Sequence, residues 1–249
     1  MRRKITEEKK KIFKEKGFGI TEFVFDDRDC ILVSPRNPRN DGKWFFKTEY
    51  FGAFPSFEIE MLDRGYYLAH MQSTTRWCPE KDTVARAEFC RYMTENYGLS
   101  KRCMPVGMSC GGMQAVYLAA KYPQLVSALY LDAPVMNLLS CPCGLGTATN
   151  KLYEEFSKDM GITVSELLNY RHHPVDYIDD LIRERIPTVL VCGDSDSVVP
   201  YSENGAILSE AYKKTDIPFL EILKSGCEHH PHGLDNNAPL VEFAEKYYI

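Results

Sequence analysis

The chain has 249 residues, of which 30 are basic, 35 are acidic and 44% are hydrophobic. This length is sufficient for one large domain with a substantial buried core. The near balance of charge offers no basic surface for nucleic acid or for an anionic membrane, so neither is expected as a partner.

The cysteine count and the N-terminus indicate a cellular compartment. Nine cysteines, an odd number, are scattered among the expected strands and helices, which favours reduced thiols over a disulfide framework. The basic N-terminus lacks the apolar core of a secretory signal, and no stretch approaches the roughly 18 apolar residues of a membrane span. The one close pair, Cys141 and Cys143, has no second pair at metal-ligand spacing. The sequence therefore predicts a cytoplasmic protein without a zinc site.

Elements over the first hundred residues alternate between strand and helix. They are a charged N-terminal helix (3–16), strands at 21–25, 30–34, 44–50 and 66–71, a helix around 57–62 and a longer helix at 83–97.

The second half continues this alternation with one interruption. The expected elements are strands at 103–106, 126–131, 188–192 and 219–223, and helices at 113–122, 203–214 and 238–248. Such alternation predicts an α/β fold with a mostly parallel, doubly wound sheet. Residues 136–186 carry helical patterns but no convincing strand, and we interpret them as a small helical cap; the alternative is a surface excursion without function. The whole chain, 1–249, is thus expected to be a single domain with its core in residues 20–135 and 187–249.

The spacing Gly107-x-Ser109-x-Gly111, between a strand and a helix, is typical of a nucleophile elbow. A serine on so tight a turn is strained, and glycines on either side remove the Cβ atoms that would collide with strand and helix. The turn would raise the Ser109 hydroxyl above the sheet edge, at the N-terminus of a helix. Ser109 is therefore the candidate nucleophile; the alternative is an ordinary glycine-rich turn.

A serine hydroxyl needs a base to take its proton and an acid to orient that base. Loops after later strands offer both: Asp194 and Asp196 follow the strand at 188–192, and His229 follows the strand at 219–223. The order serine, aspartate, histidine is that of an elbow-type hydrolase. Asp132, at the end of the strand after the elbow, is an alternative acid.

The chain resembles the α/β-hydrolases over residues 20–249, and three motifs carry the resemblance. They are Gly107-x-Ser109-x-Gly111, Gly193-x-x-Asp196-x-x-Val199-Pro200 and Gly226-x-x-His229. The resemblance implies Asp196 as the acid, three residues after a strand-ending glycine, and His229 as the base. Glu228 departs from the family pattern, in which glycine is common, and its carboxylate would compete for the imidazole N–H of His229.

Purely structural roles are the alternatives for these candidate residues. Asp194 and Asp196 also suit a turn or a helix cap. The cluster of His229, His230 and His232 can in principle chelate a metal, but its spacing beside a proline favours a turn, so no metal ligand is predicted.

An acyl-transfer site also needs two N–H donors for the developing oxyanion. One is expected from the amide of Cys110, directly after the nucleophile. The loop after the strand at 44–50 is expected to supply the other through Tyr50, although it lacks the His-Gly pair that many relatives carry. Glu49 and Trp77, also on loops after strands, are the predicted substrate contacts; for Trp77 a packing role is the alternative.

The resemblance implies a serine esterase that cleaves a small carboxylic ester, such as an acylated sugar, with no metal or organic cofactor. The expected partner is this small-molecule ester, and no feature of the sequence indicates an oligomer interface. Two other functions remain: a non-catalytic protein that binds a small ligand or a partner, and a peptidase of the prolyl oligopeptidase kind. The peptidase is disfavoured because such enzymes typically carry a large extra domain, for which this chain is too short.

Overall fold

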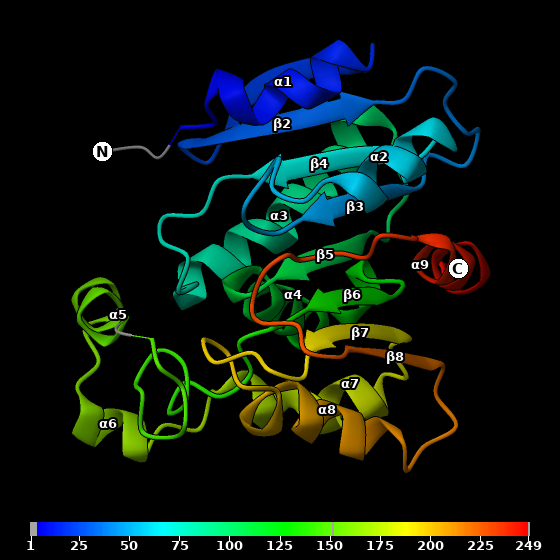
Figure 1. Cartoon of the computed structure of the whole chain (residues 1–249). Coiled ribbons are helices and arrows are strands. Elements are labelled where there is room, and N and C mark those ends of the chain that lie inside the picture. The colour runs from blue at the N-terminus through cyan, green and yellow to red at the C-terminus, as the bar shows by residue number, and fades with distance from the viewer. Residues whose placement is uncertain (1–3, 151, 249) are drawn as a thin grey trace.

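A computed structural model describes residues 4–150 and 152–248. Within them one eight-stranded sheet has the order β1-β2-β4-β3-β5-β6-β7-β8 (Figure 1). The pairs β1–β2 and β2–β4 are antiparallel, and all other neighbours in the sheet are parallel. This topology confirms the predicted α/β fold. The strands are β1 (Gly19–Phe25), β2 (Arg28–Ser34), β3 (Trp44–Lys47), β4 (Tyr67–Met71), β5 (Met104–Met108), β6 (Leu129–Asp132), β7 (Thr188–Gly193) and β8 (Phe219–Lys224).

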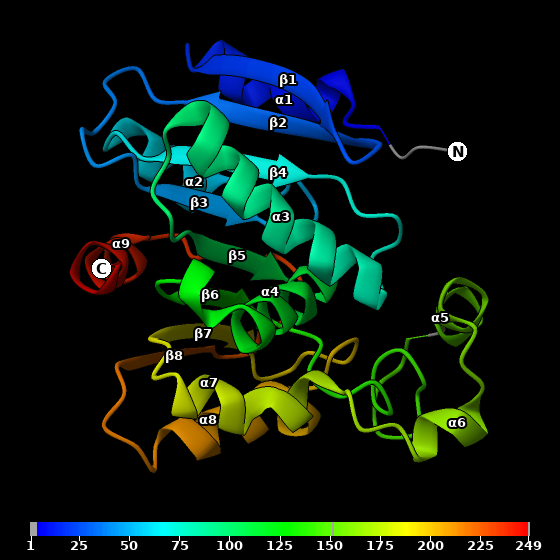
Figure 2. The same ribbon diagram turned by 180° about the vertical axis from the view of Figure 1, so that it is seen from behind.

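Helices cover both faces of the sheet (Figures 1 and 2). In this described part of the chain, none is both long and apolar enough to cross a membrane. The helices are α1 (Glu7–Glu15), α2 (Ser56–Asp63), α3 (Glu80–Tyr97), α4 (Cys110–Lys121), α5 (Tyr153–Met160), α6 (Val164–Leu168), α7 (Ile178–Arg183), α8 (Gly205–Tyr212) and α9 (Ala238–Tyr247), with short 3-10 turns η1 (Pro123–Leu125), η2 (Pro174–Tyr177) and η3 (Tyr201–Glu203).

The hydrophobic core has two layers because successive strand residues face opposite sides of the sheet. In β3, Phe45 packs with Phe57 of α2 and with residues of α9. The next residue, Phe46, packs with Phe89 of α3 and with residues of α4. Both layers are apolar, which is why the central strands are continuous hydrophobic runs in the sequence.

Predicted boundaries differ from the structure at several elements, among them the N-terminal helix and the strand before Tyr50. The N-terminal helix, expected over 3–16, is α1 over Glu7–Glu15, and residue 3 lies outside the described residues. The strand expected over 44–50 ends at Lys47. Residue 50 cannot belong to the strand, because Tyr50 has a φ of 55°, in the left-handed region that lies outside β-strand geometry. The residues after Lys47 therefore form a loop at the edge of the sheet.

Residues 136–186 contain α5, α6, η2 and α7, and within the described part no strand. Helices α5 and α6 stand away from the sheet beyond the carboxyl ends of its strands (Figures 1 and 2). Helix α7 instead buries Ile178 and Leu181 in the main core. The part that stands clear of the sheet is thus shorter than the predicted segment.

His70 in β4 makes stability depend on pH. Its side chain is fully buried, with Nδ1 2.7 Å from the carbonyl oxygen of Lys47. Burial lowers the pKa of His70 from 6.5 to about 4. Between those two values the unfolded chain binds a proton that the folded chain does not, so acidification destabilises the fold. We expect a loss of about 3 kcal/mol once the pH has fallen through this window.

The test is urea unfolding of the wild type and of His70→Asn across this pH range. Asparagine keeps an N–H donor for Lys47 but does not titrate, so the variant should lack this part of the pH dependence. Equal pH dependence of unfolding in the two proteins would contradict the assignment.

Candidate active site

Ser109 lies at the sharp turn between β5 and α4. Its φ of 53° and ψ of −120° are strained backbone angles, as a nucleophile elbow requires. Two glycines make the turn sterically possible. A Cβ on Gly107 would lie 2.4 Å from the carbonyl oxygen of Gly111, and one on Gly112 would lie 2.4 Å from the Cβ of Pro134. The strand, the helix and the segment after β6 therefore approach too closely for any larger residue at these positions.

Ser109, His229 and Asp196 form one hydrogen-bonded chain. His229 Nε2 lies 3.1 Å from Ser109 Oγ, and His229 Nδ1 lies 2.7 Å from Asp196 Oδ2. The three residues follow β5, β8 and β7, whose carboxyl ends meet at one edge of the parallel part of the sheet. His229 and Asp196 are only 7% and 6% exposed, so water competes little for these hydrogen bonds. This geometry allows His229 to accept the hydroxyl proton of Ser109.

Backbone amides orient the Asp196 carboxylate. Its Oδ1 accepts hydrogen bonds from the N–H groups of Val198 and Val199 at 2.9 and 2.8 Å, which leaves Oδ2 for His229. The neighbouring carboxylate of Glu228 accepts from the backbone N–H and the hydroxyl of Ser197, at 3.1 and 3.0 Å. The expected competition of Glu228 for the imidazole of His229 therefore does not occur.

Asp132, the alternative acid, has a different histidine partner. Its Oδ1 lies 2.6 Å from Nδ1 of His232, and its Oδ2 accepts from the Gly233 amide at 2.7 Å and from the Tyr130 hydroxyl at 3.1 Å. Both oxygens are thus occupied, and the structure does not bring Asp132 to His229. The buried pair of Asp132 and His232 lies beside the triad and was not predicted.

A cavity of about 280 Å³ opens in front of Ser109, and Tyr50 and Cys110 both line it. The N–H of Tyr50 finds no acceptor within the described residues. The N–H of Cys110 is at the first position of α4, where amides have no acceptor in their own helix. The two residues whose amides were predicted as oxyanion donors therefore line the same cavity as Ser109.

Cys110 was predicted to act through its amide and not through its thiol. Burial raises the pKa of the Cys110 thiol to about 11, which favours the uncharged thiol at neutral pH. Other cavity-lining residues, which the sequence analysis missed, include Arg76, Cys141, Leu152 and Val198. Arg76 directly precedes Trp77, which was predicted to contact the substrate, so the prediction identified the correct loop but the wrong residue. Cys141 and Leu152 come from the inserted segment, where no motif marked them.

Trp77 anchors the inserted segment and does not line the cavity. The side chain is 1% exposed and packs edge-on against Phe156 of α5, with ring centroids 5.5 Å apart. Its Nε1 donates to Glu155 at 3.1 Å, and Arg76 Nε donates to the same carboxylate at 2.7 Å. The structure thus gives Trp77 the packing role that was the alternative prediction.

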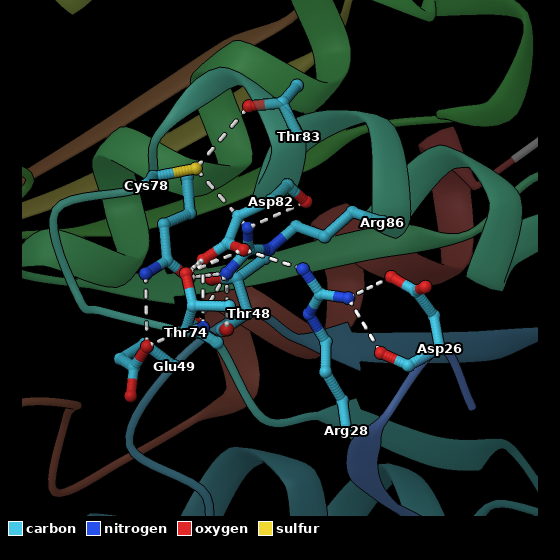
Figure 3. Close-up of polar contacts among 11 residues, drawn as sticks. Asp26, Arg28, Thr48, Glu49, Thr74, Cys78, Asp82, Thr83 and Arg86 are labelled. Carbon is cyan, nitrogen blue, oxygen red and sulfur yellow. Dashed lines mark hydrogen bonds and ion pairs between the residues drawn. The ribbon is translucent and has the colours of Figure 1, made fainter. Parts of the chain in front are cut away.

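Glu49 is also buried away from the cavity, within the polar network of Figure 3. Its Oε2 accepts from the Ser73 hydroxyl at 2.5 Å and from Gln114 Nε2 at 3.0 Å. The same two side chains accept from the guanidinium of Arg86 at 2.7 and 2.5 Å. Glu49 and Arg86 are therefore opposite charges bridged by two neutral groups. The predicted contact of Glu49 with substrate is replaced by a role under the loop that carries Tyr50.

The network continues toward the antiparallel edge of the sheet. Arg28 of β2 donates to Asp82 at 2.8 Å and also contacts Asp26 (Figure 3). Asp82 in turn accepts from the backbone and side chain of Thr74 at 2.8 to 2.9 Å. Buried charges that are hydrogen-bonded in this way hold their loops in one conformation. The loops that follow β3 and β4 are consequently fixed to α3.

The sheet topology and the serine elbow define the class of the protein, an α/β-hydrolase, as the motifs implied. More narrowly, the chain belongs to the prolyl oligopeptidase family, whose model matches residues 78–248.

Solved structures with a similar fold carry names of peptidases and hydrolases. A puromycin hydrolase is 18% identical, with a TM-score of 0.72 over 92% of this chain and 39% of that chain. The acylaminoacyl peptidase of Pyrococcus horikoshii is 14% identical, with a TM-score of 0.71 over 99% and 44%. A puromycin-hydrolyzing peptidase of Mycobacterium tuberculosis is 14% identical, with a TM-score of 0.69 over 92% and 39%. At these identities the likeness shows the fold alone, and this chain spans less than half the length of each structure.

The family match corrects one argument from the sequence. Chain length was taken to disfavour a peptidase of the prolyl oligopeptidase kind. The match covers the elbow, the acid and the histidine loop within residues 78–248, so membership does not depend on a further domain in this chain.

Proposed function

We propose that this chain is a serine hydrolase that cleaves an amide bond in a short peptide or an aminoacyl compound. The observation that carries the proposal is the hydrogen-bonded chain of Ser109, His229 and Asp196 on a strained elbow, in a member of the prolyl oligopeptidase family. Names of the structural neighbours, puromycin hydrolase and acylaminoacyl peptidase, support amide over ester substrates.

In the proposed mechanism, Ser109 Oγ attacks the substrate carbonyl while His229 Nε2 takes the hydroxyl proton. Asp196 holds the resulting imidazolium. The amides of Cys110 and Tyr50 bind the oxyanion of the tetrahedral intermediate. His229 then gives the proton to the leaving amine, and water hydrolyses the acyl-enzyme with His229 again acting as base. No metal or organic cofactor takes part in these steps.

The cavity limits the size of the proposed substrate. A volume of about 280 Å³ lies just below the range of drug-sized ligand pockets, which favours a small group at this position. We therefore expect the acyl side of the substrate to enter it, under Leu152 of the inserted segment. The proposed substrate is a small molecule or a short peptide. The cytoplasmic location of the protein remains a prediction from its sequence.

A small carboxylic ester, the substrate expected from the sequence, is the second candidate. A matched pair of substrates decides between them: N-acetyl-aminoacyl p-nitroanilide and the p-nitrophenyl ester of the same acyl group. For each, kcat/KM is divided by the uncatalysed rate constant, because the ester is intrinsically more reactive. A larger rate enhancement for the anilide supports the peptidase, and enhancement of the ester alone would favour the esterase. Absence of both would favour a non-catalytic binding protein.

A further inference from the structure

Three histidines on the loop after β8 face one another. The ring centroids of His229, His230 and His232 are 4.9 Å apart in each pair. One nitrogen of each ring lies within 4.8 Å of the other two, and the described residues hold no second group of this kind. The spacing along the sequence favoured a simple turn, but the loop folds so that three potential imidazole ligands converge.

Carboxylates orient two of these rings. Asp196 lies 2.7 Å from Nδ1 of His229, and Asp132 lies 2.6 Å from Nδ1 of His232. When Nδ1 donates to a carboxylate, the lone pair of the neutral imidazole is on Nε2. A carboxylate behind a histidine is the usual outer shell of a metal-binding histidine, since it fixes the ring and raises its basicity. Two of the three ligands are thus already oriented.

The third ligand, His230, is the exposed member and can adjust. A tetrahedral ion with metal–nitrogen bonds of about 2.0 to 2.1 Å needs nitrogens roughly 3.3 Å apart, so nitrogens that lie within 4.8 Å of one another must close by up to about 1.5 Å. His230 stacks on Phe54, with centroids 5.6 Å apart, and its ring nitrogens make no hydrogen bond within the described part of the chain.

We propose that His229, His230 and His232 form an inhibitory site for Zn²⁺ or another transition-metal ion that prefers imidazole. The same Nε2 of His229 that lies 3.1 Å from Ser109 Oγ would bind the ion. Its lone pair is then no longer available for the serine proton, so the ion and the catalytic step compete for one atom. All three rings border the cavity, which leaves the fourth coordination position open to water. Mg²⁺ and Ca²⁺, which prefer oxygen ligands, should not bind.

Metal binding by the three histidines does not depend on the proposed hydrolytic function, whereas inhibition by the metal rests on it. The experiment therefore measures binding and inhibition separately. Zn²⁺ is titrated calorimetrically into the metal-free full-length chain, and Co²⁺ is titrated with absorption spectroscopy as a probe of tetrahedral coordination. We expect one bound ion per chain. His230→Gln should weaken binding at least about tenfold, and Asp132→Asn about 10- to 100-fold. His172→Gln is the matched control, because His172 is exposed and contacts Tyr177 elsewhere.

Ser109→Ala should bind Zn²⁺ as tightly as the wild type, which shows the site even if no substrate is ever found. In the active protein Zn²⁺ should inhibit, a chelator should restore activity, and His230→Gln should shift the inhibition to higher Zn²⁺. Equal Zn²⁺ affinity in His230→Gln and His172→Gln, or no tetrahedral Co²⁺ spectrum, would overturn the metal site. Tight binding without inhibition in an active enzyme would overturn the competition for His229.

Discussion

Replacing Ser109 by alanine is expected to lower kcat by about 10⁶ and to abolish covalent labelling by a fluorophosphonate. Alanine carries the same Cβ as serine, so the strained backbone at φ 53° meets the same steric environment. The substitution therefore removes the nucleophile and its contact with His229 but leaves the fold in place. Intact-mass measurement should show one adduct on the wild type and none on the variant.

Ser195→Ala is the control for this experiment, because the exposed hydroxyl of Ser195 donates to Asp194 on the same loop and does not contact the triad. It should be labelled like the wild type. A label that persists on Ser109→Ala would identify another nucleophile. A folded wild type that stays unlabelled would mean that no activated serine is present. That result would favour the alternative function, a non-catalytic protein that binds a small ligand.

Asp196→Asn should lower kcat by about 10⁴ with little effect on folding. The amides of Val198 and Val199 hold one side-chain oxygen, and asparagine can satisfy them only with its carbonyl oxygen. Its NH₂ group then faces Nδ1 of His229 where a carboxylate stood. The imidazole must move its proton to Nε2, and it can no longer accept the proton of Ser109. Steady-state kinetics measures the loss.

Asp132→Asn provides the matched comparison, since Asp132 is equally buried but is bonded to His232. It should retain most of the activity because the Ser109–His229 contact is untouched. If Asp132→Asn lost as much activity as Asp196→Asn, the two carboxylates would share the orienting role.

Local patterns in the sequence predicted the elbow and the fold. Gly107 is required by its close approach to Gly111 within the same turn, so the local spacing of these glycines around Ser109 identified the turn. Asp196 and His229 were identifiable because each follows a buried strand, and ends of parallel strands meet at one edge.

Roles that depend on partners distant in the sequence could not be read in this way. Glu49 precedes Tyr50 on a loop, and its burial depends on Arg86 and Gln114, which belong to α3 and α4. Trp77 is enclosed by α5, whose position no motif indicated. Tertiary packing determines the roles of both Glu49 and Trp77. Sequence patterns do not encode which charged or aromatic residue will contact a partner that is distant in the sequence.

Separation along the chain makes the triad a reporter of folding. Ser109 and His229 are 120 residues apart, and their contact requires β5, β6, β7 and β8 to be in register. A fluorophosphonate present during refolding would therefore mark only those chains in which this half of the sheet is complete. Comparing the rate of labelling with the rate at which helical circular dichroism returns would show whether this half of the sheet is completed after the helices have formed.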